Sequence, residues 1–236
     1  MGGVSKVAQA SKLKTEFVSV ASHQLRTPLT AFKWSTEELL STELDKDQQP
    51  LAETLQEASQ GMLKIVNNLL DVSRADSGRL KLDKRSVSLN EITDEVIENL
   101  TPLARARNVL IEFKKKDGEK FETMADKEKI KMVILNLIDN AIIYSHHPGK
   151  VEIAIAANNH QTTLSVKNMG VGIPRKEQPL IFKKFFRSEN AMKYQVKDSG
   201  LGLFIARSFV KAHKGKIRFV SKENKETTFY ISLPNK

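Results

Sequence analysis

Apolar residues recur at alternating spacings of four and three between Leu51 and Val72, and this heptad pattern restricts the fold more than any other feature of the chain. The seam consists of Leu51, Leu55, Ala58, Met62, Ile65, Leu69 and Val72. Such a seam predicts a helix over residues 50–75 that packs against other helices. A second helix is predicted over residues 5–42, interrupted by Pro28, and residues 41–49 read as a short polar turn between the two.

A hairpin of two such helices makes a poor hydrophobic core by itself, because each helix keeps an apolar side without a neighbour. Two copies of the hairpin would complete a four-helix bundle and cover those sides. We therefore predict a homodimer with twofold symmetry, joined through the hairpin.

The pattern changes after Gly78, a residue type that commonly ends helices. Residues 79–86 are predicted to be a basic linker between a helical hairpin (residues 1–78) and a second domain (residues 87–236). In that domain helices are predicted at 89–107, 127–144 and 201–213, and strands at 109–113, 121–124, 151–155, 164–166, 217–220 and 228–233. The expected fold class is α plus α/β: a two-helix hairpin, then an α/β sandwich with helices over one face of a mixed, mainly antiparallel sheet.

The composition argues against several classes of function. The chain of 236 residues has no cysteine, which rules out disulfides and thiolate metal sites. It has no apolar run near the ~20 residues that span a bilayer and no signal peptide. We therefore expect a cytoplasmic piece without membrane contact, while an upstream sensor anchored in the cell membrane stays open. The net charge of +10 is scattered, without basic stripes between aromatic residues, so no nucleic-acid partner is expected.

His23 is the first candidate for chemistry. It lies off the apolar face of the first predicted helix, so its imidazole is expected to reach solvent. A neutral imidazole is a competent nucleophile near pH 7. Pro28 follows shortly after and removes a backbone hydrogen bond, which makes room beside the histidine. A lone histidine of this kind is usually an ordinary surface residue, but the string Ser-His-Gln-Leu-Arg-Thr-Pro-Leu over residues 22–29 changes that interpretation.

Four further segments suggest a nucleotide site, although the chain has no Gly-x-x-x-x-Gly-Lys-Ser/Thr loop. Residues 136–141 place two asparagines on one helix face, where amide oxygens can complete a Mg²⁺ shell. Residues 168–174 and 198–203 hold closely spaced glycines, and glycine-rich backbone at a helix start presents N–H groups to phosphate. Residues 181–187 combine aromatic and basic side chains, as either a mobile flap or a core helix. Each segment alone is a weak signal.

Together and in this order, the four segments resemble the N, G1, F and G2 boxes of the Bergerat-type ATP-binding domain, and residues 22–29 resemble the phosphoacceptor motif of sensor histidine kinases. The resemblance covers nearly the whole chain from Thr15 onward. It implies that ATP with Mg²⁺ phosphorylates His23, and that the phosphoryl group passes to an aspartate of a response regulator receiver domain. It also implies that Gln24 orients the imidazole, that Thr27 positions water when that partner is dephosphorylated, and that Arg187 reaches the γ-phosphate.

The same resemblance implies roles around the nucleotide. Asn140 would hold Mg²⁺, Asn136 would support the phosphates and Tyr144 would stack on the adenine. Gly170 and Gly172 would line the adenine pocket beside Asn168, and Gly200 and Gly202 would cradle the phosphates. Phe182 and Phe186 would belong to a flap that docks on the hairpin, and residues 188–199 would form the lid.

Three residues depart from the family's pattern and indicate weaker use of ATP. Gln24 replaces an acidic residue, Ile143 replaces a common lysine, and Asn168 replaces the aspartate that accepts from the adenine amino group. An active but slow kinase is the main hypothesis. The alternatives are a pseudokinase acting as a dimeric scaffold or response-regulator phosphatase, another Bergerat ATPase, and, more distantly, a DNA-binding protein.

Overall fold

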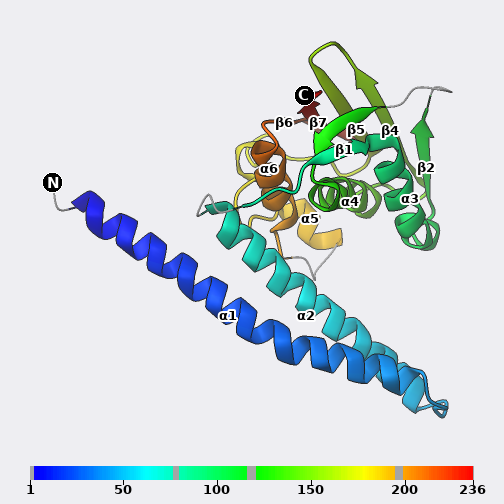
Figure 1. Cartoon of the computed structure of the whole chain (residues 1–236). Coiled ribbons are helices and arrows are strands. Elements are labelled where there is room, and N and C mark those ends of the chain that lie inside the picture. The colour runs from blue at the N-terminus through cyan, green and yellow to red at the C-terminus, as the bar shows by residue number, and fades with distance from the viewer. Residues whose placement is uncertain (1–2, 77–79, 116–120, 195–198, 236) are drawn as a thin grey trace. The chain divides into compact units, whose positions relative to one another are not determined.

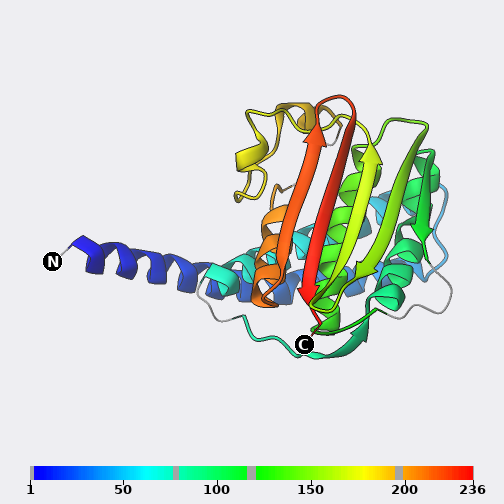
Figure 2. The same cartoon turned by 90° about the horizontal axis from the view of Figure 1, so that it is seen from above.

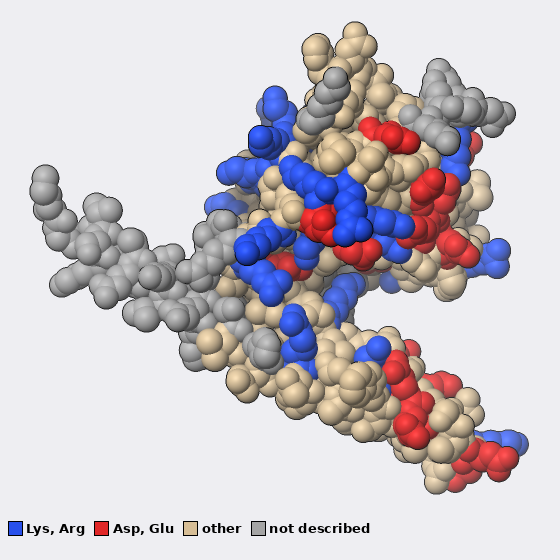
Figure 3. Space-filling view, in the orientation of Figure 1, with Lys and Arg blue, Asp and Glu red and all other residues tan. Residues whose placement is uncertain are grey.

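The computed structural model of the chain describes residues 3–76, 80–115, 121–194 and 199–235, leaving out the side chains of residues 3–19, 23, 75 and 76. The chain forms two compact units, Met1–Leu80 and Lys81–Lys236. Residues 1–80 carry nine Lys and Arg against ten Asp and Glu, so the excess of positive charge resides wholly in the second unit. Figure 3 shows acidic side chains gathered near the turn of the helical hairpin.

The first unit is an antiparallel hairpin of α1 (Gly3–Leu40) and α2 (Gln48–Asp76), joined by the polar turn that the sequence predicts (Figure 1). Small side chains line the contact between the helices, because Ser22 and Thr36 of α1 and Ala52 and Ser59 of α2 are buried. In the turn, the Asp45 carboxylate accepts the Gln48 N–H at 2.7 Å and so caps the start of α2.

A second apolar seam of the hairpin faces away from this contact. It contains large exposed side chains from both helices, which are Leu25, Phe32, Leu39, Leu51, Leu55, Met62 and Ile65. Most of the predicted heptad positions of α2 belong to this outer seam. The hairpin therefore leaves uncovered the side that the sequence assigns to a partner helix.

The second unit is built on a five-stranded sheet in the order β2-β4-β5-β7-β6 (Figure 2). The bounds are β2 Val109–Lys114, β4 Gly149–Ala157, β5 Gln161–Met169, β6 Lys216–Lys222 and β7 Glu226–Pro234. Only the β2–β4 pair is parallel among these strands, and the other three pairs are antiparallel. The prediction of a mixed, mainly antiparallel sheet is confirmed.

Three helices cover one face of this sheet (Figure 2): α3 (Leu89–Ala106), α4 (Lys127–Ile143) and α6 (Gly202–Ala212). The Asp126 side chain caps α4 by accepting the Lys129 N–H at 3.1 Å, at the start of the helix predicted over residues 127–144. Fully buried isoleucines and leucines on α4 pack toward alternate residues of the central strands, such as Ile153 and Leu164. The core thus lies between one sheet face and its helices.

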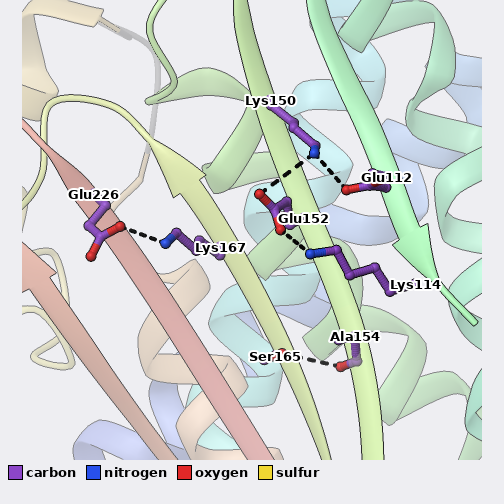
Figure 4. A network of polar contacts seen from close by, with 8 residues as sticks. All are labelled: Glu112, Lys114, Lys150, Glu152, Ala154, Ser165, Lys167 and Glu226. Atoms are coloured by element: carbon purple, nitrogen blue, oxygen red, sulfur yellow. Dashed lines mark hydrogen bonds and ion pairs between the residues drawn. The ribbon is translucent and has the colours of Figure 1, made fainter.

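The opposite sheet face carries a ladder of ion pairs between neighbouring strands (Figure 4). Lys114 of β2 contacts Glu152 of β4 at 2.5 Å, and Lys167 of β5 contacts Glu226 of β7 at 2.7 Å. The hydrogen bond from Lys114 lowers the pKa of the Glu152 carboxyl. Lys150 adds a contact of 2.7 Å to Glu112 on the edge strand β2. Pairs of opposite charge across strands support the register of the sheet.

One short strand was not predicted. Strand β1 (Arg85–Ser88) begins within the predicted linker and pairs antiparallel with β3 (Glu122–Ala125) in a separate two-stranded sheet. A 3₁₀ turn, η1 (Gln178–Leu180), and a short helix, α5 (Glu189–Tyr194), lie between β5 and α6, where the sequence predicts a long loop with short helical pieces.

Candidate active site

Helix α4 carries the first candidate segment. Asn136 and Asn140 stand one helical turn apart, half-buried, next to the fully buried Leu137 and Ile138. A Cβ atom on Gly202, the first residue of α6, would lie 3.0 Å from the Asn136 Oδ1 atom. The first and fourth sequence segments therefore meet, with the amide of Asn136 against the start of α6.

The second segment forms the turn after β5. Asn168 is 5% exposed and lies between its strand partners Val151 and Thr227. A Cβ on Gly170 would collide with the Tyr144 carbonyl oxygen, and a Cβ on Gly172 with the Lys222 carbonyl oxygen. Both glycines are thus required by close backbone packing, which is a reason for them that does not involve a ligand.

Tyr144 caps the C-terminal end of α4, beside this turn. Its carbonyl oxygen accepts the Val171 N–H at 3.2 Å, and its side chain is half-buried. The preceding residue, Ile143, is 4% exposed. Its side chain belongs to the apolar core, so the structure gives no sign that this position faces phosphate, as the resemblance implied for a lysine.

The third segment contains three phenylalanines in different settings. Phe182 is half-buried and its ring stacks edge-on against Phe219 of β6 at 5.9 Å, with the Arg207 guanidinium 5.5 Å from the ring centre. Phe182 is therefore held against β6 and α6 and does not extend from a free flap. Phe186 is half-buried. The role of both residues in docking on the hairpin stays a prediction.

Phe185 is the residue of this segment that sequence reasoning missed. It is 63% exposed, adopts a φ of 61°, and donates its N–H to the Gly200 carbonyl oxygen at 3.1 Å. Phe182 and Phe185 are three residues apart, about one helical turn, and this spacing was the available signal. It does not reveal which of the two rings is exposed to solvent. The next basic residue, Arg187, is half-buried with an enclosed Nε atom.

The segment predicted to form the lid, residues 188–199, contacts neighbouring backbone at its start and is followed by a constrained glycine. Asn190 of α5 donates from Nδ2 to the Gly172 carbonyl oxygen at 3.0 Å, and its Oδ1 accepts from Ser188 Oγ at 2.6 Å. At the other end Gly200 has a φ of 66°, and a Cβ there would lie 2.8 Å from the Phe185 carbonyl carbon. Residues 195–198, including Asp198 of the fourth segment, lie outside the described part of the chain.

The phosphoacceptor candidates lie on α1 in the first unit. The helix continues through Pro28, and the side chain of His23 lies outside what the structure describes. Gln24 and Thr27 are exposed. Arg26 donates from its Nη2 to Asn67 Oδ1 of α2 at 2.8 Å, which fixes the two helices together near this position.

The structure thus groups the nucleotide candidates into one neighbourhood. Asn136 adjoins Gly202, the end of α4 at Tyr144 adjoins Gly170, and Asn190 contacts the Gly172 carbonyl oxygen. Among the described residues no group of three or more His, Asp or Glu side chains is placed to hold a metal ion. The magnesium prediction therefore depends on Asn140 together with oxygen atoms of a phosphate ligand.

Two family models match the chain. The His Kinase A (phospho-acceptor) domain matches residues 13–78, and the histidine kinase-, DNA gyrase B-, and HSP90-like ATPase matches residues 125–236. The first match contains His23, and the second contains every nucleotide candidate named above. None of the described helices is long and apolar enough to cross a membrane.

Curated relatives match nearly the whole chain. The sensory/regulatory protein RpfC of Xanthomonas campestris is 29% identical over 98% of this chain and 32% of its own length. The signal transduction histidine-protein kinase BarA of Escherichia coli is 28% identical over 97% of this chain and 25% of its own length. The sensor protein kinase WalK of Staphylococcus aureus is 31% identical over 98% of this chain and 56% of its own length. The chain spans about a third or less of the first two proteins.

Solved structures give the same picture. The catalytic domain of histidine kinase ThkA is 31% identical, with a TM-score of 0.57 over 65% of this chain and 98% of that domain. Full-length ShkA in complex with AMPPNP has a TM-score of 0.76 over 93% of this chain and 45% of its own, at 23% identity. Because the identity to ShkA is low, this similarity is evidence for the fold alone.

Proposed function

We propose that this chain, which belongs to the histidine kinase family, transfers the γ-phosphoryl group of ATP to a ring nitrogen of His23. In this step the bond between the γ-phosphorus and the oxygen that bridges to the β-phosphate breaks, a nitrogen–phosphorus bond forms, and ADP leaves. The observation that best supports the proposal is the contact between Asn136 and the start of α6, because it brings the amide-bearing helix and the glycine-rich helix start to one place.

The residues of the second unit have separate tasks in this proposal. Backbone N–H groups at the start of α6, near Gly200 and Gly202, bind the phosphates. Asn136 orients them through its amide, and Asn140 holds Mg²⁺, which neutralises charge on the phosphates. Tyr144 and Asn168 contact the adenine, and the neutral Asn168 amide accepts from the adenine amino group more weakly than a carboxylate would.

The residues of the first unit act on the phosphoryl acceptor. Gln24 accepts a hydrogen bond and orients the imidazole of His23, but an amide cannot take up a proton. We expect slower phosphorylation for this reason. In the second unit, Arg187 neutralises charge on the γ-phosphate, and Phe182 and Phe186 belong to the flap that docks on the hairpin. Residues 79–86 would act as the hinge between units of residues 1–78 and 87–236.

In this proposal the phosphoryl group passes from His23 to an aspartate of a response regulator receiver domain. Thr27 positions the water that later removes the phosphoryl group from that aspartate. The His Kinase A match supports such a partner and a homodimer through the hairpin. The exposed apolar seam of α1 and α2 supports the dimer independently.

Labelling with γ-³²P-ATP and Mg²⁺ tests the first step. We expect wild-type chain to incorporate an acid-labile, base-stable label, His23→Ala to incorporate none, and Asn140→Ala at least tenfold less. The matched controls are His160→Ala and Asn159→Ala, which remove an exposed residue of the same type from the β4–β5 turn. Equal labelling of wild type and His23→Ala would contradict the proposal.

A catalytically inactive scaffold is the second candidate, favoured by the neutral Asn168 and Gln24. It predicts no calorimetric binding of AMPPNP at millimolar concentration, with dimerisation retained.

A second experiment tests the onward transfer of the main proposal. When an isolated receiver domain is added to the labelled chain, the label should be lost from His23 and appear on the receiver domain.

A further inference from the structure

His213 is a buried histidine at the C-terminal end of α6, and its ring connects two helices. It is 2% exposed, and its Nδ1 lies 2.8 Å from the Phe209 carbonyl oxygen of the same helix. Its Nε2 lies 3.0 Å from the Asp126 backbone nitrogen, whose N–H donates to it. A backbone N–H can only donate, so Nε2 must be unprotonated and Nδ1 must carry the proton. These contacts therefore require the neutral ring.

The two helices that His213 connects are the ones that meet at the nucleotide candidates. Asp126 immediately precedes α4, and His213 immediately follows α6. At the other end of the pair, Gly202 at the start of α6 adjoins Asn136 of α4. The helices therefore run antiparallel, with one contact at each end. The end at His213 holds a second contact, because the Lys129 ammonium lies 4.8 Å from the centre of the Phe209 ring.

We propose that His213 is a positioning residue for the nucleotide: its neutral ring holds the end of α6 against the start of α4, and protonation releases this hold, so that nucleotide affinity falls in acid. The inference rests on the proposed function, because it assumes that the Asn136–Gly202 end of the helix pair binds the phosphates. His213 itself does not touch the nucleotide in this proposal.

The surroundings of the ring favour release over a new partner. A protonated Nε2 would point its N–H at the Asp126 N–H, and two donors cannot bond. The Asp126 carboxylate is already held by backbone groups, since Oδ1 accepts the Lys129 N–H and Oδ2 accepts the Asp83 N–H, both at 3.1 Å. Lys84 adds positive charge on the side of the β1 segment.

The direction of the pH effect follows from burial. Burial lowers the pKa of His213 below its ordinary value of 6.5, and Lys84 lowers it further, while the Phe209 carbonyl and Asp126 raise it. The neutral, connected form is complete above this ordinary value and is lost as the pH falls through the lower pKa of the folded protein. Affinity is therefore expected to be constant at neutral pH and to fall on acidification.

Calorimetric titration of the whole chain with AMPPNP and Mg²⁺ at pH 7.5 and pH 5.5 tests the inference. The decisive variant is His213→Gln, whose Oε1 can accept from Asp126 N–H in the place of Nε2 but does not titrate. We expect the wild-type affinity to fall on acidification by about fivefold more than that of His213→Gln, the factor that one net hydrogen bond is worth. The shorter His213→Asn side chain keeps a donor for the Phe209 carbonyl but cannot bring an acceptor to the place of Nε2, so it should bind weakly at both pH values.

His160→Gln is the matched control, because it removes an exposed histidine of the same unit. This control should show the wild-type pH dependence of AMPPNP affinity. Titration of the AMPPNP phosphates affects wild type and all three variants equally, so it cancels in the comparison. Equal acid-to-neutral affinity ratios for wild type and His213→Gln would overturn the inference while leaving the proposed function intact. Absence of AMPPNP binding at any pH would instead remove the proposed function.

A measurement on the wild-type chain keeps the test independent of variant folding. The ¹⁵N chemical shifts of the His213 ring report its protonation, and saturating AMPPNP should lower the pKa of this ring, because linkage makes the coupling reciprocal. An unchanged His213 pKa on binding would refute the inference even if every variant failed to fold.

Discussion

Asn168 is the residue whose chemistry most directly limits nucleotide affinity in the proposed function. We predict that Asn168→Asp raises AMPPNP affinity about tenfold, since a charged acceptor forms a hydrogen bond roughly twice as strong. The position is 5% exposed, so an unpaired carboxylate there costs stability in the free protein. Calorimetry should show tighter binding while thermal unfolding without nucleotide shifts to lower temperature.

Asn159→Asp provides the same change of charge at an exposed site on the β4–β5 turn. It should leave both affinity and unfolding temperature within error of wild type. If Asn168→Asp bound AMPPNP no more tightly than this control, the adenine contact assigned to Asn168 would be wrong.

Two glycines of the site allow binding to be separated from folding. An alanine Cβ at Gly202 meets only the end of the Asn136 side chain, 3.0 Å away, whereas one at Gly170 collides with the Tyr144 backbone. We predict that Gly202→Ala weakens AMPPNP binding with an unfolding free energy near that of wild type. Gly170→Ala should lose about 2 kcal/mol or more of unfolding free energy.

Urea unfolding together with AMPPNP titration of both variants tests this contrast. A Gly202→Ala chain that binds as well as wild type would show that the Asn136 amide does not need its observed place beside α6.

At the scale of elements, Gly61 marks a weak point in α2. It lies in the interior of the helix and is exposed, and a Cβ there would meet nothing within 4 Å. We predict that Gly61→Ala raises the free energy of unfolding by about 1 kcal/mol, because alanine has the higher helix propensity and fewer unfolded conformations. Urea unfolding of the whole chain measures the change.

Gln60→Ala is a suitable comparison, since it exchanges one good helix former for another at the adjacent exposed position. A gain of equal size in both variants would indicate a general effect of alanine and not relief of the glycine.

The elements that sequence predicted well are those with a long apolar period. Helix α4 has a capping Asp126 and an apolar stripe, strand β5 alternates between buried and more exposed residues along its whole length, and β4 does so in its central part. Strand β1 has four residues with one large apolar side chain, and its partner β3 is distant in sequence, so no local pattern predicts the pair. Helix α5 has no buried residue and thus no apolar stripe.

The candidate site was predictable as a set of segments but not as a set of contacts. The order of motifs located Asn136 and Gly202, yet their contact arises from antiparallel packing of α4 and α6. Likewise, nothing local indicates that Phe182 stacks against Phe219 of β6 while Phe185 stays outside. The connection through His213 was missed because its partner is a backbone N–H, which has no sequence signature.

At the scale of the whole molecule, the outer seam of the hairpin predicts the oligomeric state. We expect the chain to sediment as a dimer, and Ile65→Glu to sediment as a monomer, because a charge buried in a four-helix bundle without a partner is costly. Lys64→Glu is the matched control at an exposed neighbouring position, and it should remain dimeric. A dimeric Ile65→Glu chain would place the interface elsewhere.

The five-stranded sheet ends in two edge strands, β2 and β6. Both carry charged side chains on alternate residues: Glu112 and Lys114 on β2, and Lys216, Arg218 and Lys222 on β6. Charged side chains along an edge strand disfavour its backbone pairing with an edge strand of another molecule. The sheet is therefore expected to resist edge-to-edge joining with other copies of the chain even at high protein concentration.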